Sequence, residues 1–557
     1  MKFRLVYIAV LLACFVSCDK KSNTPDPLPP PPPPPSLVFN SLSVNGSFSG
    51  FSYYGVNTDP SIRLSFSAPL NRTSVANAVS FRNSSGANVA FNLTYQNGDS
   101  SLLIRPTSPL GHISKYTVSV STALKSTAGG YLQSAVNLEL VTAIDMADKF
   151  PQISEEALLT KVQEQTFKYF WDFAHPVSGL ARERNTSGET VTTGGSGFGI
   201  MAIITGIHRN FITRQQGLAR MQTIVGFLKN TAQKFHGAFP HWMNGTTGAV
   251  IPFSTKDNGA DLVETSFLME GLLTARQYFN GGDAAETGLR NDINTIWQNV
   301  EWSWFRKNNE NVLYWHWSPN YNWEMNMQIR GWNECLITYV LAASSPTYSI
   351  PKTVYDNGWA QNGAMKNLNT YYGYKLPLGP PFGGPLFFEH YSFLGIDPNG
   401  LSDQYANYQQ QTTNHTKIKY EYCKANPRNW YGYSDSCWGL TASDIPNGYT
   451  ASSPTNDVGV IAPTAALSSF PYTPVESMKA LKFFYYKLGD KLWGEYGFKD
   501  AFSLKDTWFA NSYLAIDQGP IIVMIENHRS GLLWDLFMSC PEVKTGMLNL
   551  GFQSPHL

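Results

Sequence analysis

The sequence has no excess of charge of either sign, and charged residues are scarce. Its 557 residues include 41 Lys and Arg against 41 Asp and Glu, and charged residues make up 15% of the chain. Proteins that bind nucleic acid or anionic membrane surfaces present a basic footprint, which this balance does not provide. We therefore expect no nucleic acid partner and no electrostatic membrane partner.

Cysteine is also scarce. Of six cysteines, four lie beyond the N-terminal segment, namely Cys335, Cys423, Cys437 and Cys540, which is too few for a disulfide-built scaffold. Cys423 and Cys437 are close enough in sequence to bridge in an oxidising compartment. The sequence leaves that pairing open.

Common catalytic signatures are missing from the chain. It has neither an H-E-x-x-H zinc motif nor a phosphate-binding P-loop. The segment TTGGSGFG lacks the P-loop lysine, and Phe198 occupies the last position of what would be a G-x-S-x-G turn. We expect these glycines to form a tight loop before a helix that begins near Phe198.

One long apolar run is present, at the N-terminus. Residues 1–4 are basic and residues 5–17 apolar, which fits a signal peptide and is shorter than the roughly 20 residues of a membrane span. The stretch LLACFVSCDKKSN resembles a bacterial lipoprotein signal with Cys18 as the lipidated residue, although Cys14 fits the lipobox equally well. We expect a protein anchored through this lipid to the bacterial outer membrane, on its periplasmic or cell-surface face.

The next segments differ in composition. Residues 19–36 form a proline-rich linker, expected to extend as polyproline II. Residues 37–144 alternate apolar and polar positions between turn residues, which predicts an antiparallel β-sandwich. Their FSAPL (residues 66–70) and YTVSV (residues 116–120) segments resemble strands of bacterial Ig-like modules. Because no carboxylates or histidines gather in them, we expect a spacer without chemistry.

From residue 147 to residue 557 the apolar period becomes helical. About a dozen helices are predicted, joined by long loops rich in Gly, Pro and aromatic residues. So many helices cannot all face one central core, which favours a toroid of helical hairpins with a groove at the end where the loops gather. The fold class expected is therefore mainly α, with an N-terminal β-sandwich.

Three carboxylates are spaced for one site. Asp257, Asp261 and Glu264 stand at i, i+4 and i+7, so they converge at the start of a helix. Cleavage of a glycosidic bond needs one protonated and one ionised carboxyl group, and crowding is one way to separate their pKa values. The alternative interpretation is structural, since Asp261-x-x-Glu264 is also a capping-box arrangement.

Aromatic residues are abundant at 14% of the chain, and their faces are natural platforms for sugars. Tryptophans cluster in residues 302–332, directly before Glu334 at the start of a predicted helix. Asp517 is predicted to precede a helix started by Pro520, whereas Glu526 and Arg529 are expected to form a structural pair. The candidate substrate-binding residues are Trp315, Trp317, Trp323, Trp332, Asn333, Glu389, His390 and Trp438, with Asp444 a weaker groove candidate.

Five motifs occur in a fixed order: FWDFAHPVSGLARER, DNGADLVETSFLMEGLL, RGWNE, YSDSCWGLTASD and DQGPIIVMIENHRSGLLW. Together they resemble the bacterial glucoamylase-like domain of glycoside hydrolase family 144, over about residues 150–552. The resemblance implies an (α/α)6 barrel that hydrolyses β-1,2-glucan with inversion, either internally or by releasing sophorose from an end. By position, the family's acidic set falls on Asp257, Asp261, Glu264 and Glu334, with Asp517 as a fifth member.

The resemblance also implies roles. Inversion needs a carboxylic acid that protonates the departing oxygen and a carboxylate that activates water on the opposite face. We assign Glu334 as the general acid, Asp517 as the first choice of base and Asp261 as the second. We expect a polysaccharide or oligosaccharide substrate, no cofactor, no metal and a monomer.

Three alternatives remain open. A non-catalytic surface glycan-binding lipoprotein would keep the anchor and the tryptophans without needing the acids. A polysaccharide lyase would need basic residues for uronic acids, and these are sparse near the motifs. An α-glucan-cleaving glucoamylase is suggested only by an older name, which is an analogy of fold.

The anchor assignment predicts that Cys18→Ala releases the protein from membranes, because the acceptor of the lipid is lost. Fractionation of cells followed by immunoblotting measures this. If the protein stays in the membrane fraction and only Cys14→Ala frees it, Cys14 is the lipidated residue instead.

Overall fold

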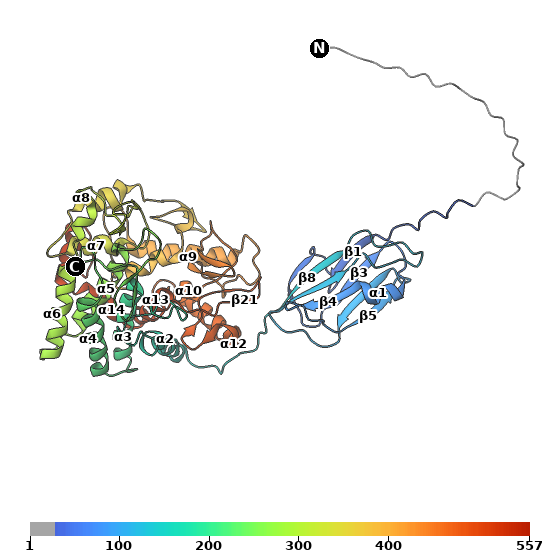
Figure 1. The fold of residues 1–557 in the computed structure, drawn as a ribbon, viewed down its shortest axis with the longest axis horizontal. Coiled ribbons are helices and arrows are strands. Elements are labelled where there is room, and N and C mark those ends of the chain that lie inside the picture. The colour runs from blue at the N-terminus through green and yellow to red at the C-terminus, as the bar shows by residue number, and fades with distance from the viewer. Residues whose placement is uncertain (1–27) are drawn as a thin grey trace, which may run out of the picture.

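The computed structural model describes residues 28–557, so the predicted signal peptide and the lipidation at Cys18 or Cys14 lie outside the described residues. The described chain has an N-terminal part built of strands and a larger part built of helices (Figure 1). Between residues 28 and 557, no helix has both the length and the apolar character needed to cross a membrane.

The N-terminal part is a sandwich of two four-stranded sheets, in which β2 and β8 run parallel and the other paired strands antiparallel. The alternation read from the sequence is observed, since every second residue of β7 is buried. One sheet has the order β1 (Phe39–Val44), β3 (Ile62–Phe66), β6 (Ser101–Pro106), β5 (Phe91–Gln96). The other has the order β2 (Ser52–Val56), β8 (Val136–Thr142), β7 (Lys115–Val120), β4 (Val79–Asn83), with the short helix α1 (Arg72–Ala78) before β4.

Five helices of the larger part are buried along nearly their whole length. Helix α3 packs against α5 and α13, α5 against α7, and α10 against α13. Buried residues lie on all sides of these helices, as expected for helices with no solvent face. They are α3 (Thr193–His208), α5 (Leu262–Tyr278), α7 (Leu336–Ser344), α10 (Pro463–Leu467) and α13 (Ala515–Ser530).

A second set of helices is amphipathic and covers the first. Helix α2 packs on α3 and α13, α4 on α3, α6 on α5, α11 on α10 and α15 on α7. These outer helices are α2 (Glu155–Trp171), α4 (Arg214–Asn230), α6 (Ala284–Gln298), α9 (Tyr408–Ala425), α11 (Pro474–Lys482) and α15 (Pro541–Leu550). The remaining short helices are α8 (Lys352–Val354), α12 (Gly489–Leu492) and α14 (Leu532–Met538).

Short hairpins and single turns fill the connections between helices. Two tight turns matter for the site, η5 (Leu386–Glu389) and η6 (Tyr391–Phe393). The short strands are β9 (Thr190–Thr192), β10 (Trp242–Asn244), β11 (Val250–Ile251), β12 (Ala260–Asp261), β13 (His316–Trp317), β14 (Thr370–Tyr371), β15 (Tyr374–Lys375), β16 (Ala442–Ile445), β17 (Gly448–Ala451), β18 (Trp493–Gly494), β19 (Gly497–Phe498), β20 (Phe502–Ser503) and β21 (Trp508–Phe509).

The glycine-rich segment is not a loop, as the sequence had suggested, because α3 begins at Thr193 and the glycines lie inside it. A Cβ on Gly197 would lie 2.0 Å from the Phe267 carbonyl oxygen, and one on Gly271 would lie 2.2 Å from that of Gly197. Each glycine costs a helix about 1 kcal/mol relative to alanine. The cost is offset because α3 and α5 can then touch backbone to backbone.

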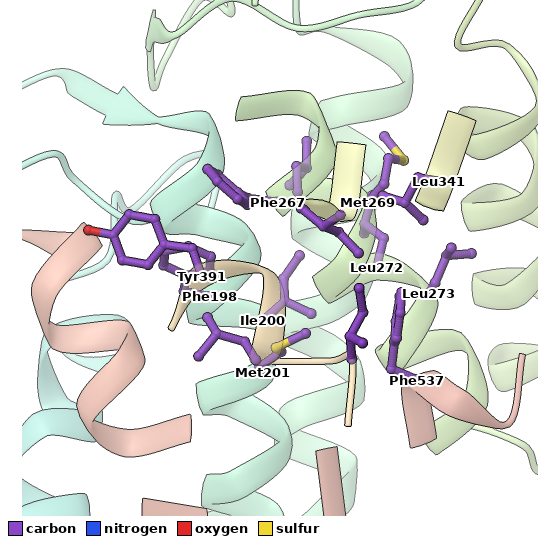
Figure 2. Packing of buried hydrophobic residues seen from close by; sticks show 14 of the residues in the cluster. Phe198, Ile200, Met201, Phe267, Met269, Leu272, Leu273, Leu341, Tyr391 and Phe537 are labelled. Carbon is purple, nitrogen blue, oxygen red and sulfur yellow. The ribbon is translucent and has the colours of Figure 1, made fainter. Parts of the chain in front are cut away.

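Apolar side chains fill the space around this contact (Figure 2). Phe198 of α3 packs against Phe267 of α5 and against Tyr391 of η6, with ring centroids 5.4 and 5.2 Å apart. All three are buried. Figure 2 shows the Tyr391 hydroxyl at the edge of this cluster. The hydroxyl of Tyr391 is therefore a polar group at the border of this apolar cluster.

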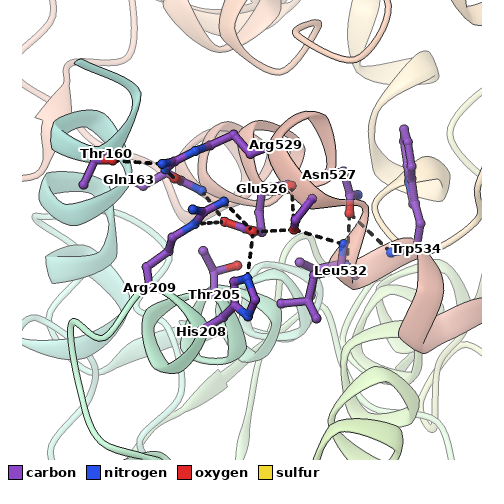
Figure 3. Close-up of polar contacts among 12 residues, drawn as sticks. Thr160, Gln163, Thr205, His208, Arg209, Glu526, Asn527, Arg529, Leu532 and Trp534 are labelled. Carbon is purple, nitrogen blue, oxygen red and sulfur yellow. Dashed lines mark hydrogen bonds and ion pairs between the residues drawn. The ribbon is translucent and has the colours of Figure 1, made fainter. Parts of the chain in front are cut away.

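At the C-terminal ends of α3 and α13, the buried Glu526 joins the helices (Figure 3). Its carboxylate accepts hydrogen bonds from Arg209 Nε at 2.7 Å, Arg209 Nη2 at 2.9 Å and Gln163 Nε2 at 3.0 Å. The expected Glu526–Arg529 pair is therefore wrong. Arg529 turns to α2 and bonds Gln163, Thr160 and Glu156 instead. Glu526 and Arg529 are both structural, as expected, but the partner of Glu526 is Arg209, which stands at the C-terminal end of the neighbouring α3.

The four cysteines beyond the N-terminal segment, Cys335, Cys423, Cys437 and Cys540, are free and buried. The bridge between Cys423 and Cys437 that the sequence left open is not formed. Both residues pack in the same apolar cluster of the helical part, and burial raises the pKa of the Cys423 thiol to about 12.

A chain that begins at Ala147 is predicted to fold alone. The apolar core of the sandwich is a separate cluster, and its contacts with the helical part include Ile113, which is buried in an apolar cluster of that part, and Tyr54, which stacks on Tyr431 with ring centroids 5.8 Å apart. The aromatic pair contributes about 1 kcal/mol and the buried Ile about 2 kcal/mol, so the thermal midpoint of so large a helical part should fall by no more than about 4 °C. Thermal unfolding followed by circular dichroism measures this. Insoluble or non-helical protein would instead show that the sandwich completes the helical core.

Candidate active site

Three buried helices begin at one place. The backbone N–H of Gly194, in the first turn of α3, donates to Glu264 Oε2 of α5 at 2.7 Å. A Cβ on the next residue, Gly195, would lie 2.7 Å from the Cβ of Ala515, the first residue of α13. The glycines therefore allow the N-termini of α3, α5 and α13 to meet. Helix N-termini carry partial positive charge and unpaired N–H groups, which favours carboxylates here.

The first acidic group consists of Asp257, Asp261, Glu264 and Glu334. Asp261 is the N-cap of α5, since its Oδ1 accepts from the N–H groups of Val263 at 3.0 Å and Glu264 at 2.9 Å. Glu264 does not complete a capping box, because its carboxylate is taken by Gly194. Asp261 therefore fits both the structural and the functional interpretation. Its Oδ1 caps helix α5, and its Oδ2 is directed toward the other residues of the first acidic group.

Two histidines that the sequence analysis missed bind this group. His241 Nδ1 lies 3.0 Å from Asp261 Oδ2. His316 Nε2 lies 3.3 Å from Asp257 Oδ2 and 3.6 Å from Asp261 Oδ2. No motif marked either residue, but β13 pairs with β12, and that pairing places His316 directly opposite Asp261.

The histidines supply positive charge. Burial lowers the pKa of His241, but the charges of Glu264 and Asp261 outweigh it and raise the pKa to about 9. His241, Asp257 and Asp261 have ligand atoms within 4.8 Å of one another, the one spacing suited to a metal ion among residues 28–557. In this arrangement a cationic His241 supplies a counter-charge to the carboxylates, while Asp257 Oδ1 has no hydrogen-bond partner among residues 28–557.

Glu334 has the electrostatic properties of an acid. It is half-buried, and burial raises the pKa of its carboxyl to about 7, with the charges of Glu264 and Asp261 adding to the effect. For Asp261, burial is outweighed by the hydrogen bond from His241 and the charge of His316, so its pKa falls below the ordinary value. The first acidic group therefore holds a protonated carboxyl beside an ionised one near neutral pH.

The segment that carries Glu334 is held in place by η5 and η6. Ser392 Oγ donates to the Glu334 carbonyl oxygen and accepts from the Ile337 N–H at 3.0 Å. Helix α7 begins at Leu336, slightly later than expected, because the Asn333 side chain caps the Cys335 N–H at 2.9 Å. Asn333 is thus engaged in the backbone of the turn.

A second acidic group consists of Asp444, Asp500 and Asp517. The Asp444 N–H donates to Asp500 Oδ2 at 2.7 Å, and Asp500 and Asp517 lie within hydrogen-bonding reach of each other. Arg184 Nη1 lies 3.3 Å from the Asp444 carboxylate. Asp444 had been named from sequence, whereas Asp500 had not, because it stands in a short loop without a motif.

Asp517 lies inside a helix rather than before one. Helix α13 begins at Ala515, not at Pro520 as the sequence had suggested. The Leu514 carbonyl already accepts from the Gln518 N–H at 2.9 Å, so a helical turn is closed before Pro520 is reached. Asp517 therefore sits in the first turn of α13, where three helix N-termini meet.

Tyr391 connects the two acidic groups. Burial raises the pKa of its hydroxyl well above the ordinary value, and the charges of Asp517, Glu334 and Glu264 raise it further. Carboxylates of both groups therefore lie near enough to Tyr391 to raise the pKa of its hydroxyl, and both groups belong to the same end of the inner helices.

Several residues expected to contact sugar are instead buried. Glu389 and Trp438 are fully enclosed and His390 and Trp332 nearly so, which makes their assignment as groove residues wrong. Glu389 Oε1 accepts from Trp332 Nε1 at 2.9 Å and lies 2.7 Å from His415 Nδ1. Trp438 donates to a backbone carbonyl of α11, and burial lowers the pKa of His390 to about 3. The helices pack closely and enclose these large side chains, whereas the sequence had suggested that they lie in exposed loops.

The other predicted tryptophans are partly exposed. Trp315 stacks on His316 with ring centroids 5.7 Å apart, at the edge of the first acidic group. Trp317 and Trp323 both pack on Trp304, at 5.5 and 4.7 Å. These three stay as predicted sugar contacts. Phe253, which no sequence pattern marked, is 51% exposed and stacks on His241 with ring centroids 4.2 Å apart.

Two family models match the chain. The family described as "Putative glucoamylase" matches residues 326–541, and the bacterial Ig-like domain matches residues 42–142. The second match coincides with the eight-stranded sandwich, and the first with the segment that carries Glu334 and Asp517.

Related proteins cover the chain more fully. An exo β-1,2-glucooligosaccharide sophorohydrolase (non-reducing end) of Parabacteroides distasonis is 49% identical over 418 residues, 71% of this chain. The chain spans 58% of the length of that relative. The solved endo-β-1,2-glucanase of Chitinophaga pinensis, in complex with sophorotriose and glucose, is 54% identical with a TM-score of 0.71, covering 73% of this chain and 100% of that one. A solved β-1,2-glucanase of Parabacteroides distasonis is 39% identical with a TM-score of 0.70, covering 93% and 73%.

Proposed function

The chain belongs to glycoside hydrolase family 144, and we propose that it hydrolyses the β-1,2-glucosidic bonds of β-1,2-glucan with inversion at the anomeric carbon. The relatives above include one endo-acting and one exo-acting enzyme, so the linkage is the property they share. The observation that carries the proposal for this chain is the pair of carboxyls in the first acidic group. Glu334 has a pKa of about 7 and stands beside the ionised Asp261.

We propose an (α/α)6 barrel for the helical part, with the outer helices around the inner ones. Support comes from the chain of contacts α10–α13–α3–α5–α7, followed by η6 against α7. Two hydrogen bonds return from the η5–η6 segment to the end of α10, His390 Nε2 to Ser469 Oγ at 3.0 Å and Tyr472 Oη to the Glu389 carbonyl at 2.7 Å. These contacts support an inner ring made of five helices and the η5–η6 segment.

Glu334 is the proposed general acid. As the bond between the anomeric carbon and the departing oxygen breaks, its electron pair stays on the oxygen, which takes the proton from Glu334. A carboxyl with a pKa near 7 is protonated at working pH and still acidic enough to give up its proton. A water molecule attacks from the opposite face and loses a proton to the base.

Asp517 is preferred over Asp261 as the base. Asp261 uses Oδ1 as the helix cap and Oδ2 for contacts with both histidines, so no oxygen is free to receive a proton. Among residues 28–557, no N–H or hydroxyl group donates a hydrogen bond to the Asp517 carboxylate, so this carboxylate keeps an oxygen for the proton of the water. The two acidic groups act on the same Tyr391 hydroxyl, as expected for an acid and a base around one substrate.

The sandwich is proposed as a spacer and the protein as a lipid-anchored monomer of the outer membrane. The lipoprotein-like signal and proline-rich linker support this placement. Neither acidic group draws a residue from the sandwich, which supports a role away from the chemistry.

Incubation of purified protein with glucans of defined linkage tests the function. We predict new reducing ends from β-1,2-glucan and none from starch or maltooligosaccharides. Glucose release from starch at a comparable rate would establish the glucoamylase alternative. An ultraviolet-absorbing product would indicate a lyase, and binding without cleavage would indicate the glycan-binding alternative.

The variant Glu334→Gln is predicted to lower kcat by at least about 100-fold, because an amide cannot give up the proton. Substrate binding and the thermal midpoint should stay near those of the wild type, since Gln is nearly isosteric. Glu324→Gln is the matched control, because Glu324 lies on the same loop but is exposed and pairs with Lys256. Single-turnover rates close to wild type for Glu334→Gln would remove Glu334 from the mechanism.

A further inference from the structure

Two buried carboxyl groups face each other in the second acidic group. Asp500 is 2% exposed and Asp517 is 3% exposed. Each has one enclosed oxygen that finds no hydrogen-bond partner within residues 28–557, Oδ1 of Asp500 and Oδ2 of Asp517. The two carboxyls are within hydrogen-bonding reach of each other. A carboxylate only accepts, so a proton held between the two carboxyls would give each of them a hydrogen bond that two ionised groups cannot make.

The surroundings provide too little positive charge for two carboxylates. The charged groups that face the pair are Asp444 and Arg184, and the Tyr391 and Tyr449 hydroxyls face Asp517. Arg184 already pairs with two other carboxylates. Its Nε lies 3.0 Å from Glu183 Oε2, and its Nη1 lies 3.3 Å from Asp444 Oδ2. One backbone N–H, that of Asp444, donates to Asp500 at 2.7 Å. Two negative charges would therefore stay uncompensated in a buried place, which is strongly unfavourable.

We propose that Asp500 and Asp517 share one proton in a carboxyl–carboxylate hydrogen bond, and that Asp500 is the positioning residue that sets the charge of the catalytic base. The inference rests on the proposed function, in which Asp517 is that base. The pair carries one negative charge at working pH and titrates as a unit. Burial, followed by the charge of the partner, raises the pKa of Asp517, and burial raises that of Asp500 to about 7.

The proton balance of the step is simple. As water attacks the anomeric carbon, its O–H bond breaks and the proton passes to the singly charged pair, which becomes neutral. The proton shared beforehand stays between the two carboxyls. After product release the neutral pair loses one proton to solvent. Asp500 thus touches no substrate, and its influence passes entirely through Asp517.

The pH dependence of kcat/KM in Asp500→Leu and Asp500→Asn tests the proposal. In the singly charged pair the shared proton gives Asp517 a hydrogen bond that favours its ionised form. Leu offers no donor, so in Asp500→Leu the acidic limb should move to higher pH by about 1 unit or more. In Asp500→Asn the amide replaces the shared proton as a neutral donor, so the limb should stay near that of the wild type. A merely structural Asp500 would lower the rate and leave the limb in place in both variants, which would overturn the proposal.

Asp457→Leu is the matched control, because Asp457 is equally buried but is hydrogen-bonded by the Tyr422 and Tyr433 hydroxyls. It should keep the wild-type limb. A limb that moves equally in this control would also overturn the proposal.

A readout without activity separates this inference from the proposed function. The pKa values of the pair are raised by folding, so the stability they contribute is present at low pH and lost as pH rises toward about 7. The fall of the thermal midpoint between about pH 5 and pH 8 should be shallower in Asp500→Asn than in wild type. If Asp517→Asn keeps full hydrolysis, the assigned base is wrong, yet this shallower slope still supports the shared proton. An unchanged slope together with an unchanged limb in Asp500→Leu refutes the shared proton.

Discussion

Carboxyl groups removed from water cost several kcal/mol each unless N–H groups or positive charge replace the water, and this chain buries two groups of them at one end of its inner helices. The N-termini of α3 and α5 and the backbone of Asp444 supply the N–H groups, and His241, His316 and Arg184 supply the charge. The rest of the site follows from that requirement. Gly194 and Gly195 are needed because any side chain would separate the helix ends that stabilise Glu264 and carry Asp517.

The same requirement creates chemical differences among carboxyls of one kind. Asp261 receives two N–H groups and contacts two histidines, and its pKa falls. Glu334 is given no cation, and burial raises its pKa to about 7. The difference between the two comes from the elements that surround each, since both lie in the same first acidic group.

Sequence patterns predicted the parts of the site that lie on one element. The i, i+4, i+7 spacing of Asp257, Asp261 and Glu264 was enough to expect their convergence, and the ordered motifs added Glu334 and Asp517. His316 comes from a bridge between β12 and β13, and no local pattern encodes such a pairing. The burial of Trp332 and Trp438 was misjudged because composition does not show which aromatic residues the packed helices enclose. The alternation of the sandwich strands, in contrast, is a local property and was predicted directly.

The central claim is that Glu334 is protonated near neutral pH because of its surroundings. Infrared difference spectroscopy of wild type against Glu334→Gln, recorded across a pH titration, measures this directly through the carbonyl stretch of a protonated carboxyl. The account predicts that the band assigned to Glu334 disappears with a midpoint near pH 7. A midpoint near the ordinary glutamate value of about 4.3 would contradict it.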